Sequence, residues 1–209
     1  MKYTSIRVYK DRAQILDHLL RLPLNDRYLR FCNTLSDEGI AKYVGRIDLR
    51  STTGEACFAV YDDEKNVVGL CHIAPYADDD GAAEMALSVD EDYRKNGIGD
   101  VLFYRGILHC ESLGIKKIYM NCLASNTPIQ RLARRHGMKV TTDYGESVAA
   151  LNLKDNNAIL AFLESVQNDT MGLYDITLRN TSARWNQYLD ALTSIAGRSA
   201  GFSQKKENE

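Results

Sequence analysis

The feature that most constrains this chain is a short basic loop, containing two glycines, that joins a strand-like stretch to a helix-like stretch. The loop is Arg94-Lys95-Asn96-Gly97-Ile98-Gly99, and it follows the small and apolar residues 83–89. Residues 97–113 have the apolar spacing of a helix and end before Gly114, a residue type common at helix C-termini. Backbone N–H groups at a helix start have no partner within the helix, and the helix dipole attracts negative charge to them. The segment therefore predicts a site for a phosphate or pyrophosphate group.

Two familiar phosphate-binding loops do not fit this spacing. A P-loop ends in Gly-Lys-Ser/Thr, whereas Asp100 directly follows Gly99 here. A dinucleotide-binding fingerprint has a third glycine at the position that Leu102 occupies. By itself, the Gly-x-Gly pattern indicates a structural turn as readily as an anion site. Asp100 suits the first turn of a helix, although its charge is unfavourable beside an anion.

Strands and helices are expected to alternate on both sides of the loop. Before it, the sequence predicts a strand at 6–9, helices at 11–21 and from residue 36, and a hairpin of 56–62 and 67–74. Pro23 is expected to end the first helix. After the loop, the sequence predicts a strand at 115–122, a helix at 127–136 and a last strand pair at 138–142 and 147–153. This order predicts a mixed α/β domain over residues 1–153.

The C-terminal part of the chain has a different character. Residues 154–196 carry apolar residues at helical spacing, and we expect a helical extension rather than a second catalytic domain. Residues 197–209 are rich in Ser, Gly, Lys and Glu, so we expect a disordered tail.

Composition argues against several classes of protein. Of the 209 residues, 44% are hydrophobic, which suits a packed core, and the net charge of −2 gives no basic surplus for nucleic acid or an anionic membrane. No apolar run is long enough to span a bilayer, and the N-terminus lacks the apolar core of a signal peptide. The five cysteines have no CxxC spacing, so we expect reduced, mostly buried thiols in a cytoplasmic protein. No residue cluster has metal-ligand spacing, and no metal is expected.

These motifs resemble those of one enzyme family. Arg94-x-x-Gly97-x-Gly99, after a strand that ends Leu87-Ser88-Val89, is similar to the coenzyme A motif of the GNAT superfamily of N-acetyltransferases. Asn126, followed by a short helix and then Gly137-Met138, resembles the second motif of that family. The match covers roughly residues 6–153. It implies a mixed, mostly antiparallel twisted sheet, flanked by helices, whose fourth and fifth strands splay apart to admit acetyl-CoA.

The resemblance also implies which residues contact the coenzyme. The pyrophosphate would meet backbone N–H groups of residues 95–100, and the pantetheine arm would run along residues 87–89. Asn126 would hold the arm from the other side. The expected contact residues are therefore Leu87, Ser88, Val89, Arg94, Lys95, Asn96, Gly97, Ile98, Gly99, Asp100 and Asn126.

Glu84 is the expected catalytic base, acting directly or through a water. The acceptor of such an enzyme is a primary amine that must lose a proton before it attacks, and Glu84 is the carboxylate of an otherwise small and apolar strand. A surface glutamate or an ion-pair partner is the structural alternative. The family often has a tyrosine seven residues after the motif asparagine, where this chain has Ala133. The missing tyrosine leaves the group that protonates the thiolate undetermined.

For the other polar residues we expect mainly structural roles. His72 is expected to be a buried structural histidine, with the role of an alternative base as the second reading. Arg134 and Arg135 are expected on a solvated helix face, with phosphate contact at the adenosine end of the coenzyme as the second reading. The polar residues of 27–30 either line the acceptor pocket or cap the early helices. The segment 26–31, with Glu84 and the missing tyrosine, gives a weaker resemblance to bacterial protein-lysine acetyltransferases.

Two functions follow from this reading. The first is acetyl transfer from acetyl-CoA to a primary amine, either of a small molecule or of a protein lysine. The second is a catalytically silent module that binds acyl-CoA and acts through a protein partner. No nucleic-acid or membrane partner is expected, and a homodimer is compatible with the sequence.

Overall fold

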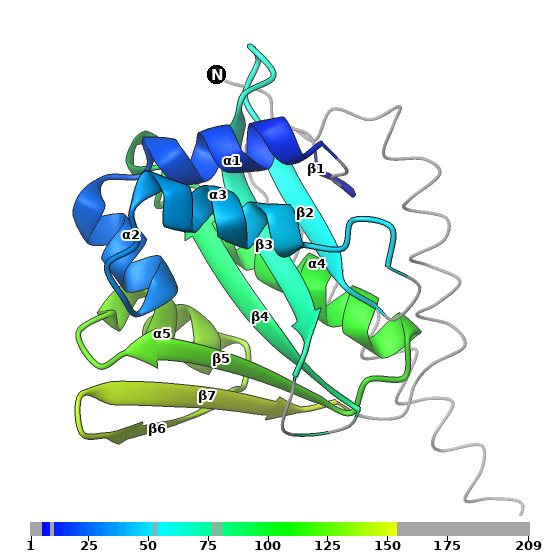
Figure 1. Cartoon of the computed structure of the whole chain (residues 1–209). Helices are drawn as coiled ribbons and strands as arrows, with labels where there is room; N and C mark the ends of the chain where they lie inside the picture. Colours follow the sequence, from blue (N-terminus) through cyan, green and yellow to red (C-terminus); the bar gives the residue numbers. More distant parts are fainter. Residues whose placement is uncertain (1–5, 9–10, 52–53, 77–78, 80, 154–209) are drawn as a thin grey trace, which may run out of the picture. The chain divides into compact units, whose positions relative to one another are not determined.

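A seven-stranded sheet forms the centre of the fold, with strands in the order β1-β2-β3-β4-β5-β7-β6 (Figure 1). The computed structural model describes residues 6–8, 11–51, 54–76, 79 and 81–153. The extension expected at 154–196 and the tail expected at 197–209 lie outside the described residues. The strands are β1 (Ile6–Val8), β2 (Ala56–Tyr61), β3 (Val67–Pro75), β4 (Ala82–Val89), β5 (Lys117–Leu123), β6 (Lys139–Asp143) and β7 (Glu146–Asn152).

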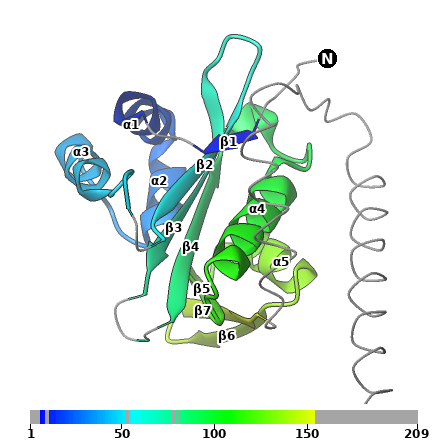
Figure 2. The same cartoon turned by 90° about the vertical axis from the view of Figure 1, so that its right-hand side faces the viewer.

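Helices cover both faces of the sheet (Figure 2). One face carries α1 (Arg12–Arg21), α2 (Leu24–Phe31) and α3 (Asp37–Arg46), and the other carries α4 (Ile98–Ser112) and α5 (Thr127–Arg135). A short 3-10 turn, η1 (Glu91–Tyr93), follows β4. The predicted helices and strands around the loop are confirmed, with bounds that differ by one or two residues.

Local sequence explains where the helices begin. Asp11 caps α1 by accepting the Ala13 N–H at 2.9 Å, and Ser36 caps α3 by accepting the Gly39 N–H at 3.2 Å. Pro23 follows the end of α1 as expected, but α2 begins directly after it, and this helix is not among those predicted from the sequence. The φ of −53° at this proline suits entry into a helix as well as exit from one.

The splay of the sheet is confirmed. β4 and β5 are the only parallel neighbours among the described strands, and they pair only through Ala82↔Lys117, Ala83↔Ile118 and Glu84↔Tyr119. Beyond Glu84, β4 continues to pair with β3, whereas β5 pairs with β7. The fourth and fifth strands therefore diverge toward their C-terminal ends and leave a split between them.

One apolar core cluster lies between the N-terminal helices and the first strands. It contains Ile15, Leu19, Leu22, Ile40, Val44, Ile47, Cys57, Ala59, Val67 and Leu70. On the other face of the sheet, α4 buries Leu102 and Phe103 completely. Four cysteines are buried and Cys32 is partly exposed, all as free thiols, so the expectation of mostly buried thiols is confirmed.

Two further findings concern only the described part of the chain. No helix there has both the length and the apolar character that a membrane span requires. No group of His, Cys, Asp or Glu side chains there is arranged to hold a metal ion.

Candidate active site

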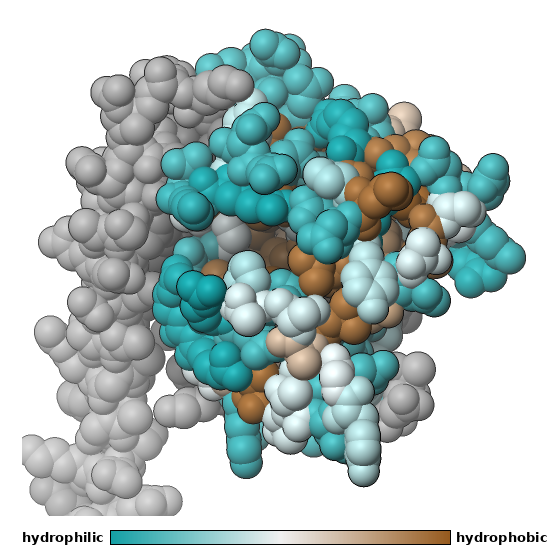
Figure 3. Space-filling model, turned by 90° about the vertical axis from the view of Figure 1, so that its left-hand side faces the viewer, coloured by the Kyte–Doolittle hydropathy of each residue, from teal (hydrophilic) through white to brown (hydrophobic). Residues whose placement is uncertain are grey.

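A cavity of about 980 Å³ lies between the C-terminal end of β4 and the start of α5, on the side where β4 and β5 part. Figure 3 views the molecule from the side of α2 and the β6–β7 turn, and apolar side chains gather across the middle of this face between hydrophilic groups. The cavity wall includes these predicted contact residues: Leu87, Ser88, Val89, Arg94, Lys95, Gly97, Ile98, Gly99, Asp100 and Asn126. Asn96 and Glu84 do not line it.

The backbone of the basic loop is shaped to present N–H groups. Lys95 has a φ of 62° and Gly97 a φ of 81°, both in the left-handed region, and Gly97 is the residue before α4. No side chain caps this helix, so its first N–H groups have no capping partner from Gly97. A Cβ built on Gly99 would meet only Leu132, at an ordinary 3.5 Å. Packing within the protein therefore does not require a glycine at position 99, whereas close approach of a ligand would.

The charge of Asp100 is neutralised within the protein. Arg135 Nη1 lies 2.7 Å and 2.8 Å from the two carboxylate oxygens, and His136 Nε2 donates to Oδ1 at 3.0 Å. The hydrogen bond from His136, together with Arg135, lowers the pKa of Asp100. The negative charge of Asp100 beside the predicted anion site is thus paired. Arg134 and Arg135 are both exposed, as expected for a solvated helix face, and Arg135 also lines the cavity.

Arg94 ties the loop to the N-terminal helices. Its Nε donates to the Val89 backbone oxygen at 3.0 Å, and its Nη2 forms an ion pair with Asp26 of α2. The arginine of the motif therefore orders the junction between β4 and the loop. Asp26 also lines the cavity, and so do Leu22, Leu29 and Arg30.

Glu84 lies at the closed end of the split between β4 and β5. It is the last residue of β4 that pairs with β5, opposite Tyr119, and it is partly buried. Its Oε1 accepts a hydrogen bond from Asn121 Nδ2 of β5 at 3.1 Å. The carboxylate thus bridges the two strands at the point where they separate, three residues before Leu87 at the cavity wall.

His72 belongs to a polar network on the same face of the sheet. Its Nε2 donates to Glu55 Oε1 at 2.9 Å, and its Nδ1 accepts from the Tyr43 hydroxyl at 2.7 Å. Tyr43 in turn accepts from Arg30 Nη2 at 2.9 Å. Burial, followed by the Arg30 charge, lowers the pKa of His72. Both ring nitrogens are engaged, which supports the structural reading of His72.

Asn126 holds two helices together. Its Oδ1 accepts the Ile129 N–H at 3.4 Å as the cap of α5, and its Nδ2 donates to the Leu29 oxygen of α2 at 3.3 Å. Arg27 is structural as well, because it donates to the Leu22 oxygen at the end of α1 and pairs with Asp37. Ala133, where the family often has a tyrosine, is buried in α5.

The residues that α1 contributes at the cavity wall were not predicted from the sequence. His18 and Leu22 are both buried, and the His18 ring contacts Ser88 at the cavity wall. One signal was available: His18 is a polar residue three positions after Ile15 and four before Leu22, within an otherwise apolar stripe.

Comparisons with known proteins agree with this geometry. The family model described as "Acetyltransferase (GNAT) family" matches residues 22–138. No curated protein sequence matches the chain.

Several solved structures have a similar fold. The GNAT domain of S. lividans PAT is 15% identical, with a TM-score of 0.61, over 73% of this chain and 90% of that one. A phosphinothricin acetyltransferase from Sinorhizobium meliloti, solved with acetyl-CoA, is 13% identical, with a TM-score of 0.58, over 75% and 91%. A Salmonella typhimurium protein solved with its cofactor acetyl-CoA is 17% identical, with a TM-score of 0.54, over 74% and 96%. At these identities the likeness shows a shared fold.

Proposed function

Because this chain belongs to the acetyltransferase (GNAT) family, we propose that it transfers an acetyl group from acetyl-CoA to a primary amine of a small molecule or a protein lysine. The observation that carries the proposal is the cavity at the split between β4 and β5, lined by the basic loop and the start of α4. Two similar folds were solved with acetyl-CoA.

The residues of the loop fit a pyrophosphate group. The uncapped start of α4 offers backbone N–H groups of Ile98, Gly99 and Asp100, and the space at Gly99 lets a ligand approach the main chain. Lys95 and Arg131 add positive charge at the cavity. The arm of the coenzyme would then extend along β4 from Val89 toward Glu84. Acetyl-CoA supplies the activated acetyl group.

Glu84 is the residue we propose to accept the proton of the amine. An amine with a pKa near ~10.4 is mostly protonated at neutral pH, so the reaction needs a base or a path for this proton. Glu84 lies at the closed end of the split, and its hydrogen bond to Asn121 orients the carboxylate. Ala133 provides no hydroxyl for the leaving thiol, so we propose that water returns the proton there.

The test is turnover measured separately from binding. Thiol release from acetyl-CoA is followed across a panel of amines and lysine peptides, and coenzyme A affinity is measured by calorimetry. We expect Glu84→Gln to lower kcat about 10²–10⁴-fold, the usual contribution of a positioned base, with coenzyme affinity unchanged. Glu64→Gln, at the exposed turn between β2 and β3, is the matched control.

Two outcomes would contradict the proposal. Equal turnover in Glu84→Gln and wild type would show that Glu84 is not the catalytic base. Tight coenzyme binding by the wild type without turnover on any amine would favour the second function, a silent acyl-CoA-binding module.

A further inference from the structure

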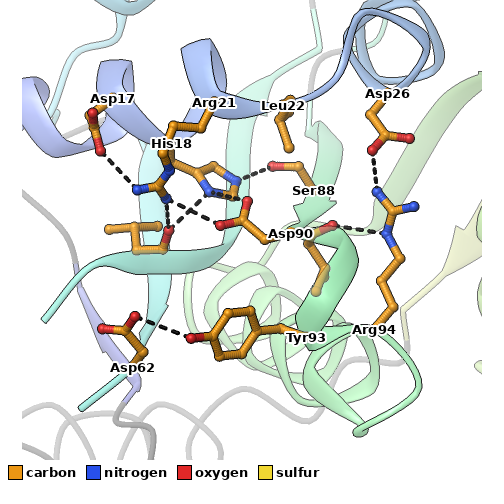
Figure 4. Close-up of polar contacts among 12 residues, drawn as sticks. Asp17, His18, Arg21, Leu22, Asp26, Asp62, Ser88, Asp90, Tyr93 and Arg94 are labelled. Carbon is orange, nitrogen blue, oxygen red and sulfur yellow. Dashed lines mark hydrogen bonds and ion pairs between the residues drawn. The ribbon is translucent and has the colours of Figure 1, made fainter. Parts of the chain in front are cut away.

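A buried imidazole on α1 contacts the part of β4 that lines the cavity (Figure 4). His18 has no exposed surface. Its Nδ1 lies 3.1 Å from the Val67 backbone oxygen and 3.1 Å from Asp90 Oδ1, and its Nε2 lies 2.8 Å from Ser88 Oγ. Burying a polar nitrogen without a hydrogen bond is costly, and these contacts satisfy both ring nitrogens.

The partners of His18 fix where the hydrogens lie. The Val67 oxygen and the Asp90 carboxylate can only accept, so Nδ1 carries the proton. In the neutral ring, Nε2 then accepts the hydroxyl hydrogen of Ser88. In this neutral form the hydrogen of Ser88 is committed to His18, so Ser88 Oγ can accept a hydrogen bond from a ligand in the cavity but cannot donate one.

The same ring holds the backbone on both sides of Val89, because Ser88 and Asp90 are the residues directly before and after it. Arg21, one turn further along α1, also holds Asp90 in place. Its Nη2 lies 3.2 Å from Asp90 Oδ2 and 2.6 Å from the Val67 oxygen.

These contacts from α1 reach β4 where it no longer pairs with β5. Near its C-terminal end β4 pairs only with β3, through Ser88↔Leu70 and Val89↔Gly69, because β5 has diverged. A strand with one neighbour has an open edge, and such an edge is the part of a sheet that can receive an extended ligand. Support from α1 holds this edge in an extended conformation without covering it.

We propose that His18 is a positioning residue for the pantetheine arm of the coenzyme. It holds Val89 extended and turns Ser88 Oγ into an acceptor for an amide N–H, of which the arm carries two. This inference rests on the proposed use of acetyl-CoA, but not on the identity of the amine or on Glu84.

The order Ser88–His18–Asp90 is also that of a hydrolase triad, in which the serine attacks an acyl group. Position argues for a different role. Ser88 lies four residues from Glu84, about 13 Å along an extended strand, and so beside the arm rather than beside the proposed base.

The experiment compares two ligands by calorimetry. One is coenzyme A, and the other is adenosine 3′-phosphate 5′-diphosphate, which keeps the pyrophosphate but lacks the arm. We expect His18→Gln to weaken coenzyme A binding about tenfold and to change binding of the armless ligand less than about twofold. Ser88→Ala should show the same selectivity with a smaller loss, because His18 also contacts Asp90. The double variant should be no weaker than His18→Gln alone, because the acceptor role of Ser88 depends on His18.

His109→Gln is the matched control. His109 is a partly buried histidine of α4 whose Nε2 bonds to the Gly54 backbone oxygen, away from the cavity lining. It should bind both ligands as the wild type does.

Three results would overturn the proposal. Equal losses for the two ligands would mean that His18 only maintains the fold, and unchanged affinity in both His18→Gln and Ser88→Ala would mean that the contact does not matter. An acetyl group found on Ser88 by mass spectrometry, after incubation with acetyl-CoA alone, would make Ser88 a nucleophile. Because none of these measurements uses an amine or turnover, their failure is distinct from failure of the proposed transferase activity.

Discussion

Asp100 is an acidic residue beside the proposed anion site. The sequence places it in the first turn of α4, where a carboxylate favours the helix dipole but repels a bound phosphate. In the structure Arg135 and His136 pair with it across the gap to α5. The residue therefore serves as a tie between two helices, and its charge is already compensated.

This tie makes a prediction about pH. The pKa of Asp100 is lowered in the folded protein by its hydrogen bond to His136. A lowered pKa contributes stability that is present above about pH 4 and is lost as the pH falls through the folded value. We expect Asp100→Asn to lower the free energy of unfolding by about 1 kcal/mol or less at pH 7, because the group is partly solvated. Urea unfolding should show a smaller difference in unfolding free energy between wild type and Asp100→Asn at pH 3 than at pH 7. A larger difference at pH 3 would contradict the lowered pKa of Asp100.

Glu111 makes the opposite prediction. Burial near the end of α4 raises its pKa to about 7. Between about pH 4 and pH 7 the folded state holds a proton that the unfolded chain releases, so this group lowers stability as the pH rises through that window. We expect Glu111→Gln to raise Tm by about 2–4 °C at pH 8, and the gain should disappear near pH 4. Thermal scans at both pH values test this, with the exposed Glu64→Gln as control. A gain that is equal at both pH values would contradict it.

At the scale of single residues, the sequence predicts backbone sites better than side-chain roles. The glycines and charges of the loop can be placed at the cavity because they stand next to each other in the chain. Asp26 and His18 could not be, because their contacts with Arg94 and Ser88 join segments about 70 positions apart. The role of Glu84 as the base stays a prediction, and the structure adds its bond to Asn121.

At the scale of elements, the packing of α4 against the sheet sets the position of the basic loop. Gly69 of β3 lies beneath the start of this helix, and a Cβ there would come within 2.7 Å of Ile98 Cγ2 and 3.0 Å of Leu102 Cδ1. Ile98 is β-branched and adapts poorly within a helix. Any side chain at position 69 would therefore push the first turn of α4 away from β3, and the loop with it.

We expect Gly69→Ala to lower the free energy of unfolding by about 1–3 kcal/mol, the usual cost of overpacking, and to weaken coenzyme A binding as well. Gly45→Ala is the matched control, since no atom lies near its added Cβ in α3 and an alanine there favours the helix by up to about 1 kcal/mol. Urea unfolding and calorimetry measure the two effects. If Gly69→Ala is destabilised but binds coenzyme A as tightly as the wild type, the packing of α4 on β3 does not set the position of the basic loop.

The pattern of elements was largely predictable, with two exceptions. α2 is only eight residues long and has no side-chain cap, so its sequence carries no capping signal that would mark its start. The place of β7 between β5 and β6 was not predictable either, because the alternation of residues along a strand does not identify its neighbours.

At the scale of the whole domain, the sheet has two unequal parts. An apolar core cluster packs α1 and α3 on β2 and β3, whereas most residues of β6 are exposed. We therefore expect faster amide exchange in β5, β7 and β6 than in β2 and β3. Coenzyme A, which would touch both sides of the split, should slow exchange in β5, while the ligand without the pantetheine arm should protect mainly residues 94–100. Hydrogen-exchange mass spectrometry tests this, and equal protection of β5 by both ligands would contradict it.

The short parallel join between β4 and β5 also has a consequence for the order of folding. β2 and β3 form a hairpin, as do β6 and β7, and such local contacts form early. The three pairs that join Ala82–Glu84 to Lys117–Tyr119 must wait for the chain to return through α4, which is a slower loop closure. We therefore expect β4 and β5 to pair late in folding. In a nascent chain, the two sides of the cavity would then form before they come together to enclose it.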